Sequence, residues 1–325
     1  MSYTLRHSPR SAAAYHAALA AYRAAPFRPP ALAGRVYPAE REALAAQLDG
    51  WLTDALQRLP EPTVAGPLKG VVCPHIDYGR GAEIYADVWL PAATAVQEAD
   101  LIIVFGTDHR GSAGSITPTY QRYATPLGIV PNDTAVLDAL VDALGEEAAF
   151  AEELHHRDEH SIELAVVWLQ YLLAGRTTPV APILTGSFHP FTQGADDAAR
   201  FAPFRQAINA LQDVTQGRRV LVVAAADLAH MGPAFGDRVP LNESARRRIA
   251  ADDKVLLDAL CTGDPTAFLQ PLQADHDARR ICGLPPVYLA LRYLAGARGN
   301  VTSYRQYPAD ATFGSLVSVA GVLLA

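Results

Sequence analysis

Short apolar runs recur along the chain, and several of them end in a polar turn that carries a histidine. Three runs share this arrangement: residues 68–73 lead to His75, residues 101–105 lead to His109, and residues 220–226 lead to His230. An apolar run of this length, bounded by glycine or proline, is typical of a buried β-strand. Because the carboxyl ends of parallel strands meet at one edge of a sheet, we expect the three imidazoles to converge on a shared site.

Apolar positions that recur every three or four residues predict helices between these strands. The clearest stripe is that of Leu44, Leu48, Leu52 and Leu56, in a helix predicted over residues 40–59. Further helices are predicted over residues 11–25, 82–96, 134–144, 155–173, 201–212, 242–260 and 286–295. Further strands are predicted at 179–184, 302–307 and 316–324, and the proline and glycine residues within 120–131 favour short strands and turns.

The order of these elements indicates the fold class. A strand, a helix and a strand follow one another over residues 68–105, which favours a parallel pair with a right-handed crossover. We find no internal repeat and no linker in the 325 residues. The sequence therefore predicts a single α/β domain over residues 31–325, with a central, mostly parallel or mixed sheet flanked by helices.

Residues 1–30 are predicted to form an N-terminal extension, helical over most of its length and rich in proline at its end. The first 39 residues contain no Asp or Glu, as is typical of an organellar transit peptide. We favour an appended alanine-rich helix, because the whole chain is rich in alanine and arginine.

Composition excludes several classes of protein. The formal net charge is -7, and no block of lysine and arginine suggests nucleic acid as a partner. The apolar runs have the length of strands, so no membrane span is expected. Three widely spaced cysteines do not predict a disulfide framework, and we expect a cytoplasmic protein with reduced thiols.

The candidate chemistry is that of histidines with carboxylates nearby. Such a group of side chains either binds iron, copper or zinc, or transfers protons without a metal. Cys282 adds a thiol just before a helix that starts with two prolines, and a helix N-terminus there would lower its pKa. The alternative for Cys282 is an ordinary buried cysteine. Cys73 lies within a predicted strand, and Cys261 has no evident partner.

The densest polar cluster is Glu159-His160-Ser161-Ile162-Glu163. On a helix Glu159 and Glu163 would share one face, with His160 roughly 100° away. The spacing is not that of the H-E-x-x-H zinc motif, and capping of a helix by Asp158 or Glu159 is the alternative interpretation. We predict that Glu159 and His160 support the pocket rather than bind metal. A serine nucleophile elbow and a phosphate-binding glycine loop are both missing from the sequence.

Seven segments, in this order along the chain, resemble those of the Memo family, whose microbial members are known as AmmeMemoRadiSam system protein B. They are AGRVYP (33–38), CPHIDYGRG (73–81), FGTDH (105–109), ATPLG (124–128), DEHSIEL (158–164), AAADLAHMG (224–232) and RICGLPP (280–286). The fold of that family is similar to that of class III extradiol dioxygenases of the LigB type. The resemblance therefore implies an α/β sheet with a non-haem metal pocket.

The resemblance also implies roles for particular residues. His75, His109 and Cys282 match the metal-ligand positions, and Asp227 and His230 match other polar residues of the pocket. We accordingly expect a non-haem redox enzyme of the oxygenase or oxidase type that uses iron(II), with copper or zinc as alternatives. His230, held by Asp227, would transfer protons.

The implied substrate is a small molecule or a peptide, and the implied partners are proteins of the radical-SAM-associated system. The alternative is a non-catalytic scaffold of the same family that binds metal, peptide or a partner protein through the same pocket.

The sequence departs from the family pattern at two places. Ile76 and Asp77 follow the first histidine, where the family has small residues, and Asp108 precedes the second histidine, where the family has an uncharged residue. Both departures add a carboxylate beside an expected ligand. These carboxylates would either orient an imidazole or change the choice of metal.

Overall fold

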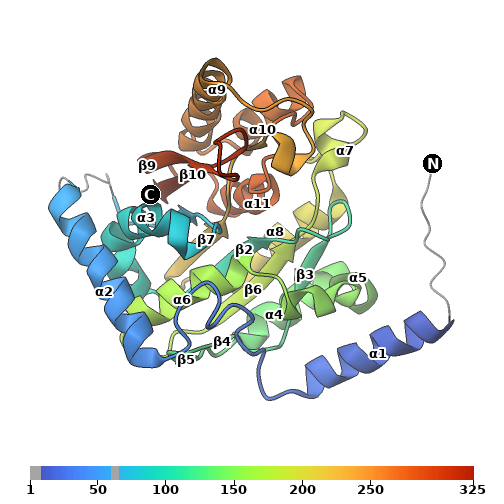
Figure 1. Cartoon of the computed structure of the whole chain (residues 1–325). Helices are drawn as coiled ribbons and strands as arrows, with labels where there is room; N and C mark the ends of the chain where they lie inside the picture. The colour runs from blue at the N-terminus through green and yellow to red at the C-terminus, as the bar shows by residue number, and fades with distance from the viewer. Residues whose placement is uncertain (1–8, 60–65) are drawn as a thin grey trace.

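A mixed sheet of eight strands forms the centre of the computed structural model, which describes residues 9–59 and 66–325 (Figure 1). In spatial order the strands are β3 (Ile116–Pro118), β6 (Val180–Thr185), β2 (Leu101–Thr107), β7 (Val220–Ala225), β1 (Gly70–Cys73), β10 (Leu316–Leu324) and β8 (His230–Met231), with β9 (Gly299–Pro308) paired to β10. The four strands from β6 to β1 are parallel, and β3, β8, β9 and β10 pair antiparallel. This arrangement confirms the predicted single α/β domain with a mixed sheet.

The three strands predicted to carry the histidines are neighbours, in the order β2, β7, β1. Every residue of β1 and β2 is buried, which is expected of parallel strands that are covered on both faces. Their carboxyl ends are level, because Cys73 of β1 and Gly106 of β2 both pair with Ala225 at the end of β7. The residues that follow these strands therefore emerge at one edge of the sheet.

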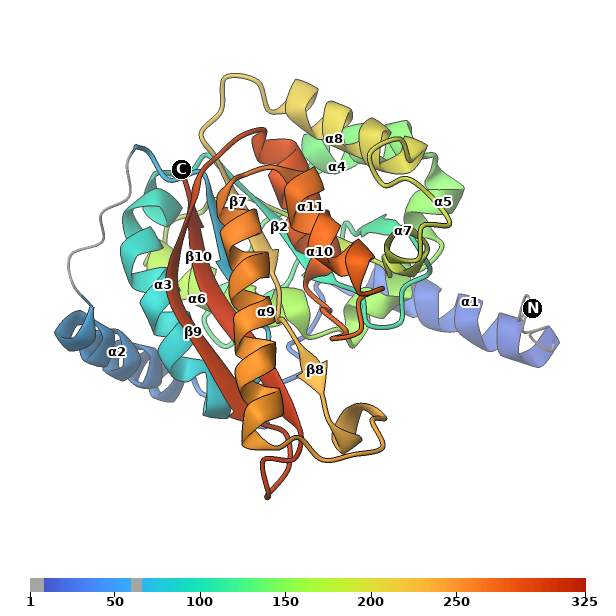
Figure 2. The ribbon, with the colours of Figure 1, turned by 90° about the horizontal axis from the view of Figure 1, so that it is seen from above.

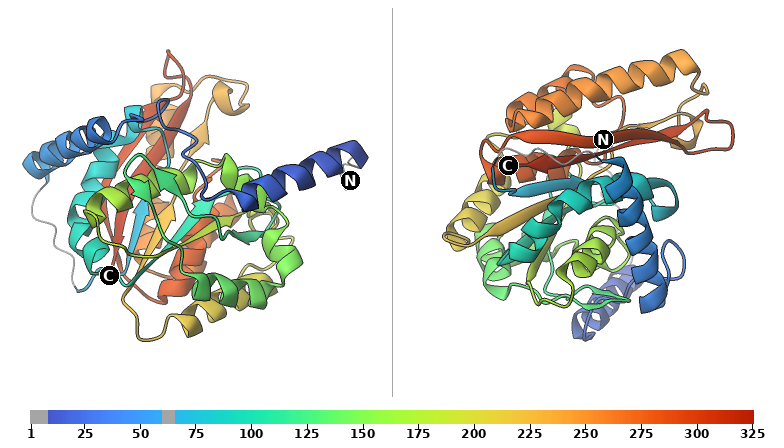
Figure 3. Two further views of the ribbon diagram at one scale, coloured as in Figure 1. Left: turned by 90° about the horizontal axis from the view of Figure 1, so that it is seen from below. Right: turned by 90° about the vertical axis from the view of Figure 1, so that its left-hand side faces the viewer.

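Helices cover both faces of the sheet (Figure 3). One face packs against α2 (Arg41–Arg58), α3 (Tyr78–Glu98) and α6 (Ser161–Leu173). The other face packs against α4 (Thr134–Leu144), α8 (Ala202–Val214), α9 (Glu243–Cys261), α10 (Pro265–Ala274) and α11 (Leu284–Leu294). Successive residues of β2 alternate between the two cores, with Ile103 in one and Val104 in the other. Figure 2 shows β9 and β10 running between α3 and α9.

Short elements fill the connections. They are α5 (Glu146–Phe150), α7 (His189–Thr192), the 3-10 helices η1 (Glu153–Arg157) and η2 (Pro233–Phe235), and a hairpin of β4 (Ala124–Thr125) and β5 (Gly128–Ile129). The hairpin lies where short strands and turns were predicted. The predicted helix over residues 155–173 is instead η1 followed by α6, because the chain turns at 158–160 between them.

The N-terminal helix α1 (Pro9–Ala24) projects from the body of the protein (Figure 1). After α1 the chain returns to the body, where Arg28 is fully buried and its backbone N–H donates to the carbonyl of Arg122. Residues 1–8 of the predicted extension lie outside the described residues. Among the helices that the structure describes, none combines the length and the apolar composition that a membrane span requires.

Candidate metal centre

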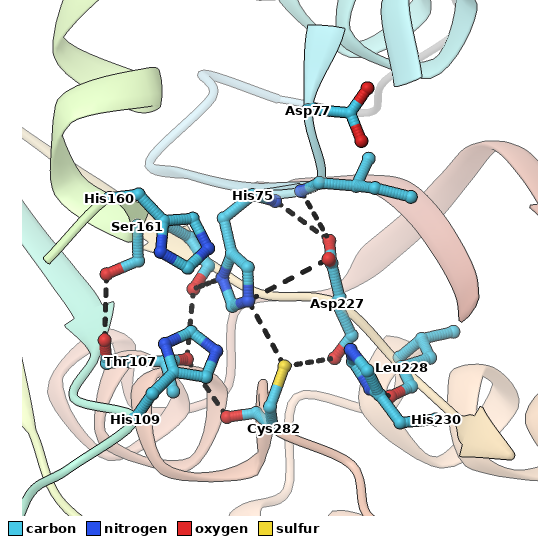
Figure 4. A network of polar contacts seen from close by, with 12 residues as sticks. His75, Asp77, Thr107, His109, His160, Ser161, Asp227, Leu228, His230 and Cys282 are labelled. Carbon is cyan, nitrogen blue, oxygen red and sulfur yellow. Dashed lines mark hydrogen bonds and ion pairs between the residues drawn. The ribbon is translucent and has the colours of Figure 1, made fainter. Parts of the chain in front are cut away.

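Three imidazoles meet at the edge of the sheet where β1 and β2 end (Figure 4). The ring centroids of His75 and His109 are 5.1 Å apart, those of His75 and His160 are 5.4 Å apart, and those of His109 and His160 are 4.8 Å apart. One ligand atom from each of the three side chains lies within 4.8 Å of the other two. His75 follows β1, His109 follows β2, and His160 stands immediately before α6.

His75 is held from both its backbone and its ring. Its backbone N–H donates to Oδ1 of Asp227 at 2.8 Å, and its ring Nδ1 lies 3.0 Å from the carbonyl oxygen of Ala225. A carbonyl can only accept, so Nδ1 carries the proton and Nε2 keeps its lone pair. Burial, reinforced by the neighbouring imidazoles, holds the pKa of His75 well below its usual value. His75 is therefore a neutral imidazole, the form that binds metal.

Glu159 orients the other two imidazoles. Its carboxylate lies 3.1 Å from Nδ1 of His109 and 3.0 Å from Nδ1 of His160, and only 4% of the Glu159 side chain is exposed. Burial would raise the pKa of Glu159, but the hydrogen bonds from the two imidazoles outweigh it, so this pKa is lowered. Burial likewise disfavours the charged form of His160, yet Glu159 raises the pKa of that imidazole. An acceptor behind Nδ1 leaves Nε2 as the donor toward a metal.

The start of α6 is tied to the end of β2. The hydroxyl of Ser161 donates to the carbonyl oxygen of Thr107 at 2.8 Å. The Glu159 carboxylate also accepts the backbone N–H groups of His160 and Ser161, at 2.8 Å and 3.1 Å. Glu159 thus serves the helix start, as the alternative interpretation expected, and orients the imidazoles as well.

Cys282 lies beside His75. Its Sγ is 3.1 Å from Nε2 of His75 and 3.8 Å from the carbonyl oxygen of Asp227. The Thr107 hydroxyl donates to the carbonyl oxygen of Cys282 at 2.9 Å, which places the segment before α11 against the end of β2. The thiol therefore faces His75, but it does not belong to the group of donor atoms from His75, His109 and His160 that lie within 4.8 Å of one another.

The lowered pKa expected for Cys282 from the sequence is wrong. Burial, together with the nearby Asp227 carboxylate, raises the pKa of the thiol well above its ordinary value. These two effects outweigh the helix N-terminus, since Cys282 precedes the first residue of α11 by two positions. A metal ion would reverse this preference, because a thiol that binds a metal is deprotonated.

Asp227 and His230 both line the site, but they are not joined as expected. Asp227 accepts the backbone N–H groups of His75 and Ile76. The ring of His230 is held instead by the carbonyl oxygen of Leu228, 3.0 Å from Nδ1. Within the described residues no hydrogen bond links Asp227 to His230. Burial lowers the pKa of His230. The negative charge of Asp227 opposes this shift without a hydrogen bond between the two side chains.

The two carboxylates that depart from the family pattern do not orient the expected ligands. Asp77 caps α3, accepts the backbone N–H of Arg80, and points away from the imidazoles (Figure 4). Asp108 lies 2.8 Å from Nδ1 of His155, away from His109. The reason is local, since Asp77 opens a helix and Asp108 turns toward η1. The carboxylates next to the imidazoles are those of Glu159 and Asp227.

Two clefts open at the centre. The histidine cleft, of about 460 Å³, is lined by His75, His109, His160, Asp227 and His230 together with apolar side chains that include Leu32, Val36 and Phe235. The cysteine cleft, also of about 460 Å³, is lined by Cys282 and His109 together with Phe188, Leu284 and Pro285 among others. His109 borders both clefts. Volumes of this size suit a small-molecule ligand.

Sequence reasoning missed one set of contacts around the centre. Arg28 and Tyr37 both bind Glu163, which lies in the first turn of the helix that follows His160. Tyr37 belongs to a segment that the motif comparison singled out, whereas Arg28 lay in the predicted extension. A single arginine among prolines carries no periodic signal, so its burial could not be read from the sequence.

Comparison with known proteins places the chain in a family. A family model described as Memo-like protein matches residues 28–323. A MEMO1 family protein of Thermus thermophilus is 32% identical over 285 residues, which cover 86% of this chain and 77% of the relative. A MEMO1 family protein of Methanosarcina mazei is 27% identical over 282 residues, which cover 85% of this chain and 91% of the relative.

A MEMO1 family protein of Aeropyrum pernix is similar to the same extent, with 29% identity over 287 residues that cover 85% of this chain and 92% of the relative. The match to the family model begins at Arg28, the residue at which the chain enters the body of the fold. It ends within β10, the last strand of the sheet. The chain therefore belongs to the Memo-like protein family.

Proposed function

We propose that the protein binds one transition-metal ion through His75, His109 and Cys282 and catalyses an oxidation of the oxygenase or oxidase type. The observation that carries the proposal is the group of three imidazoles at one sheet edge, with the thiol of Cys282 next to His75. Iron(II) is the first candidate because of the resemblance to class III extradiol dioxygenases. Copper and zinc are alternatives, because imidazole suits all three ions and thiolate favours the softer ones. When bound, iron or copper would supply a redox-active Lewis acid, whereas zinc would supply a Lewis acid without redox chemistry.

The spacing of His75 and Cys282 fits two ligands of one ion. Bonds of about 2.1 Å to nitrogen and about 2.3 Å to sulfur, at an angle of about 90–110°, place the two donors roughly 3.1–3.6 Å apart. The observed separation of Nε2 and Sγ is 3.1 Å. His160 is the competing third ligand, because its donor atom belongs to the same group as those of His75 and His109.

The residues around the ligands support proton transfer in the histidine cleft. The Leu228 carbonyl places the proton of His230 on Nδ1, which leaves Nε2 as a base. Because burial lowers its pKa, His230 is neutral at neutral pH and able to accept a proton from a bound substrate. We propose a small molecule or a peptide side chain as the substrate. The cleft would accept an apolar body along its apolar walls and a polar group at the histidines.

Cobalt(II) titration of the chelator-stripped protein tests the ligand set. We expect Cys282→Ser to abolish the sulfur-to-cobalt charge-transfer absorption and to weaken binding at least about tenfold, because a thiolate ligand is lost. Cys73→Ser and Cys261→Ser are the matched controls and should retain both properties. His160→Gln should weaken binding less than Cys282→Ser. A larger loss of cobalt affinity in His160→Gln than in Cys282→Ser, together with no charge-transfer absorption in the unmodified protein, would assign the third ligand to His160.

Metal analysis of anaerobically purified protein, followed by measurement of dioxygen uptake, tests the reaction class. We expect iron at close to one equivalent and uptake that depends on an added reductant or substrate. A protein that binds the metal yet consumes no dioxygen under any of these conditions would contradict an oxidation reaction. It would leave the non-catalytic scaffold of the Memo family as the function.

A further inference from the structure

A buried ion pair lies close to the candidate metal centre, between the chain before α2 and the start of α6. The side chains of Arg28 and Glu163 are both 0% exposed and form a salt bridge. The guanidinium carbon of Arg28 also stands 4.7 Å from the ring centroid of Tyr123. A buried ion pair contributes little net stability compared with well-packed apolar residues. The other contacts of the Arg28 guanidinium therefore indicate a role besides stabilising the fold.

The guanidinium of Arg28 reaches two backbone carbonyls as well as Glu163. Its Nε donates to the carbonyl oxygen of His156 at 2.8 Å, and its Nη2 donates to the carbonyl oxygen of Glu159 at 2.8 Å. These carbonyls stand at the two ends of the segment 156–159. One planar side chain thus fixes the segment that delivers Glu159 to the imidazoles.

Glu163 in turn binds the segment of chain that follows Arg28. Its carboxylate accepts the backbone N–H groups of Ala31 and Leu32, each at 2.9 Å, and the hydroxyl of Tyr37. We call residues 28–37 the N-terminal strap. The strap is therefore anchored at both ends to α6, the helix that begins directly after His160.

We propose that Arg28 is a positioning residue of the metal centre, which holds Glu159 so that its carboxylate fixes the rings of His109 and His160. This proposal rests on the proposed function for its metal readout, but not for its effect on the metal-free imidazoles. Only a guanidinium can make the three contacts at once, because its donors form a rigid fork. Lysine would keep the charge beside Glu163 and lose the simultaneous contacts to both carbonyls.

The test compares Arg28→Lys with Tyr37→Phe. Tyr37→Phe removes one donor to Glu163 from the same strap and leaves the contact between Arg28 and Glu159 in place. Ring nitrogen NMR signals of the metal-free protein report the tautomers. In Arg28→Lys we expect the signals of His109 and His160 to move toward a mixture of tautomers while that of His75 stays fixed. In Tyr37→Phe all three should stay unchanged.

Cobalt(II) affinity gives the second readout. Loss of a group that orients metal ligands weakens binding roughly 10–100-fold, so we expect a loss in this range for Arg28→Lys and less than about threefold for Tyr37→Phe. If the unmodified protein binds no cobalt, the proposed function fails while the NMR comparison still decides the role of Arg28. Unchanged imidazole signals in a folded Arg28→Lys protein would overturn the positioning role.

A second variant covers the case in which Arg28→Lys does not fold. Arg28→Met combined with Glu163→Gln removes both buried charges, so neither remains unpaired in the core. It also removes the contact to the Glu159 carbonyl. We expect a mixture of tautomers at His109 and at His160 in this variant as well. A single tautomer at each of these histidines would again overturn the proposal.

Discussion

At the scale of single residues, the pKa values of His75 and His160 shift in opposite directions because the two imidazoles face different acceptors. His75 faces a neutral carbonyl, so burial dominates and its pKa is lowered. His160 faces the Glu159 carboxylate, so its pKa is raised despite burial. The centre thus combines one strictly neutral imidazole with others that are held by an anion. Neutral and anionic acceptors of this kind are the usual partners of metal-binding histidines.

Asp277, at the wall of the cysteine cleft, gives a prediction about pH. Burial, together with the charge of Asp275, raises its pKa from 3.8 to about 6, although the N–H of Ile281 and the nearby Arg279 and Arg280 oppose the shift. The folded protein therefore holds a proton between about pH 4 and pH 6 that the unfolded chain has lost. Stability falls as pH rises through this window and stays reduced above it.

We expect Asp277→Asn to remove this loss. Asparagine cannot ionise, it can still accept the N–H of Ile281, and it tolerates the left-handed φ of 53° at this position. The free energy of unfolding should rise by about 1–2 kcal/mol at pH 7.5, less than a full two-unit pKa shift would imply because the side chain is partly exposed. Urea unfolding at pH 7.5 and pH 4.5 measures it. An equal gain at both values would contradict the assignment.

At the scale of elements, the centre depends on how closely α6 approaches β2. A Cβ atom at Gly106 would lie 2.4 Å from Cγ1 of Ile162 and 2.7 Å from Oγ of Ser161. Both distances are shorter than real contacts, so only glycine lets the first turn of α6 rest on the strand. Because His160 precedes that turn, the packing of α6 also sets the place of the imidazole.

Gly106→Ala should therefore displace α6. We expect a loss of about 1–3 kcal/mol in the free energy of unfolding, as for other overpacked cores, together with weaker cobalt(II) binding. Gly50→Ala in α2 is the matched control, since no atom lies within 4 Å of its added Cβ. That change should stabilise the protein by about 0.5–1 kcal/mol, because glycine is a poor helix former. Denaturation and cobalt(II) titration of both variants measure these changes in stability and in metal affinity. Equal metal affinities in the two variants would contradict the role of α6 packing in placing the imidazole.

At the scale of the whole molecule, the candidate ligands come from segments that span most of the chain. His75 and Cys282 are separated by 207 positions, and the strands that carry the site form the middle of the sheet. A metal held by such ligands binds the folded chain and not the unfolded one. Its binding free energy therefore adds to the stability of the entire fold.

Thermal unfolding with and without metal tests this coupling. At a free metal concentration of about 100 times the dissociation constant, the gain should be about 2.7 kcal/mol, which corresponds to a rise in Tm of several degrees for a domain of this size. His75→Ala should abolish the rise, whereas Cys261→Ser should retain it. A rise that persists in His75→Ala would mean that the metal binds elsewhere.

Much of this arrangement was encoded locally. Apolar runs at 68–73, 101–105 and 220–226 predicted three neighbouring strands of one sheet, which the structure confirms. The βαβ order over residues 68–105 predicted a parallel pair; β1 and β2 are parallel, but β7 lies between them. The histidine that follows each run then had to emerge at one edge, which the positions of His75, His109 and His230 confirm. These features depend on residue type and on short spacings, so the sequence alone determined them.

The contacts that complete the centre were decided only by the tertiary structure. The ring of His160 meets those of His75 and His109 because the turn at 158–160 replaces the continuous helix that periodicity predicted. Arg28 meets Glu163 across 135 positions of the chain, and Cys282 meets His75 across 207. Contacts at such separations arise from the packing of α6, α11 and the N-terminal strap against the sheet, and no local pattern of apolar and polar residues specifies them.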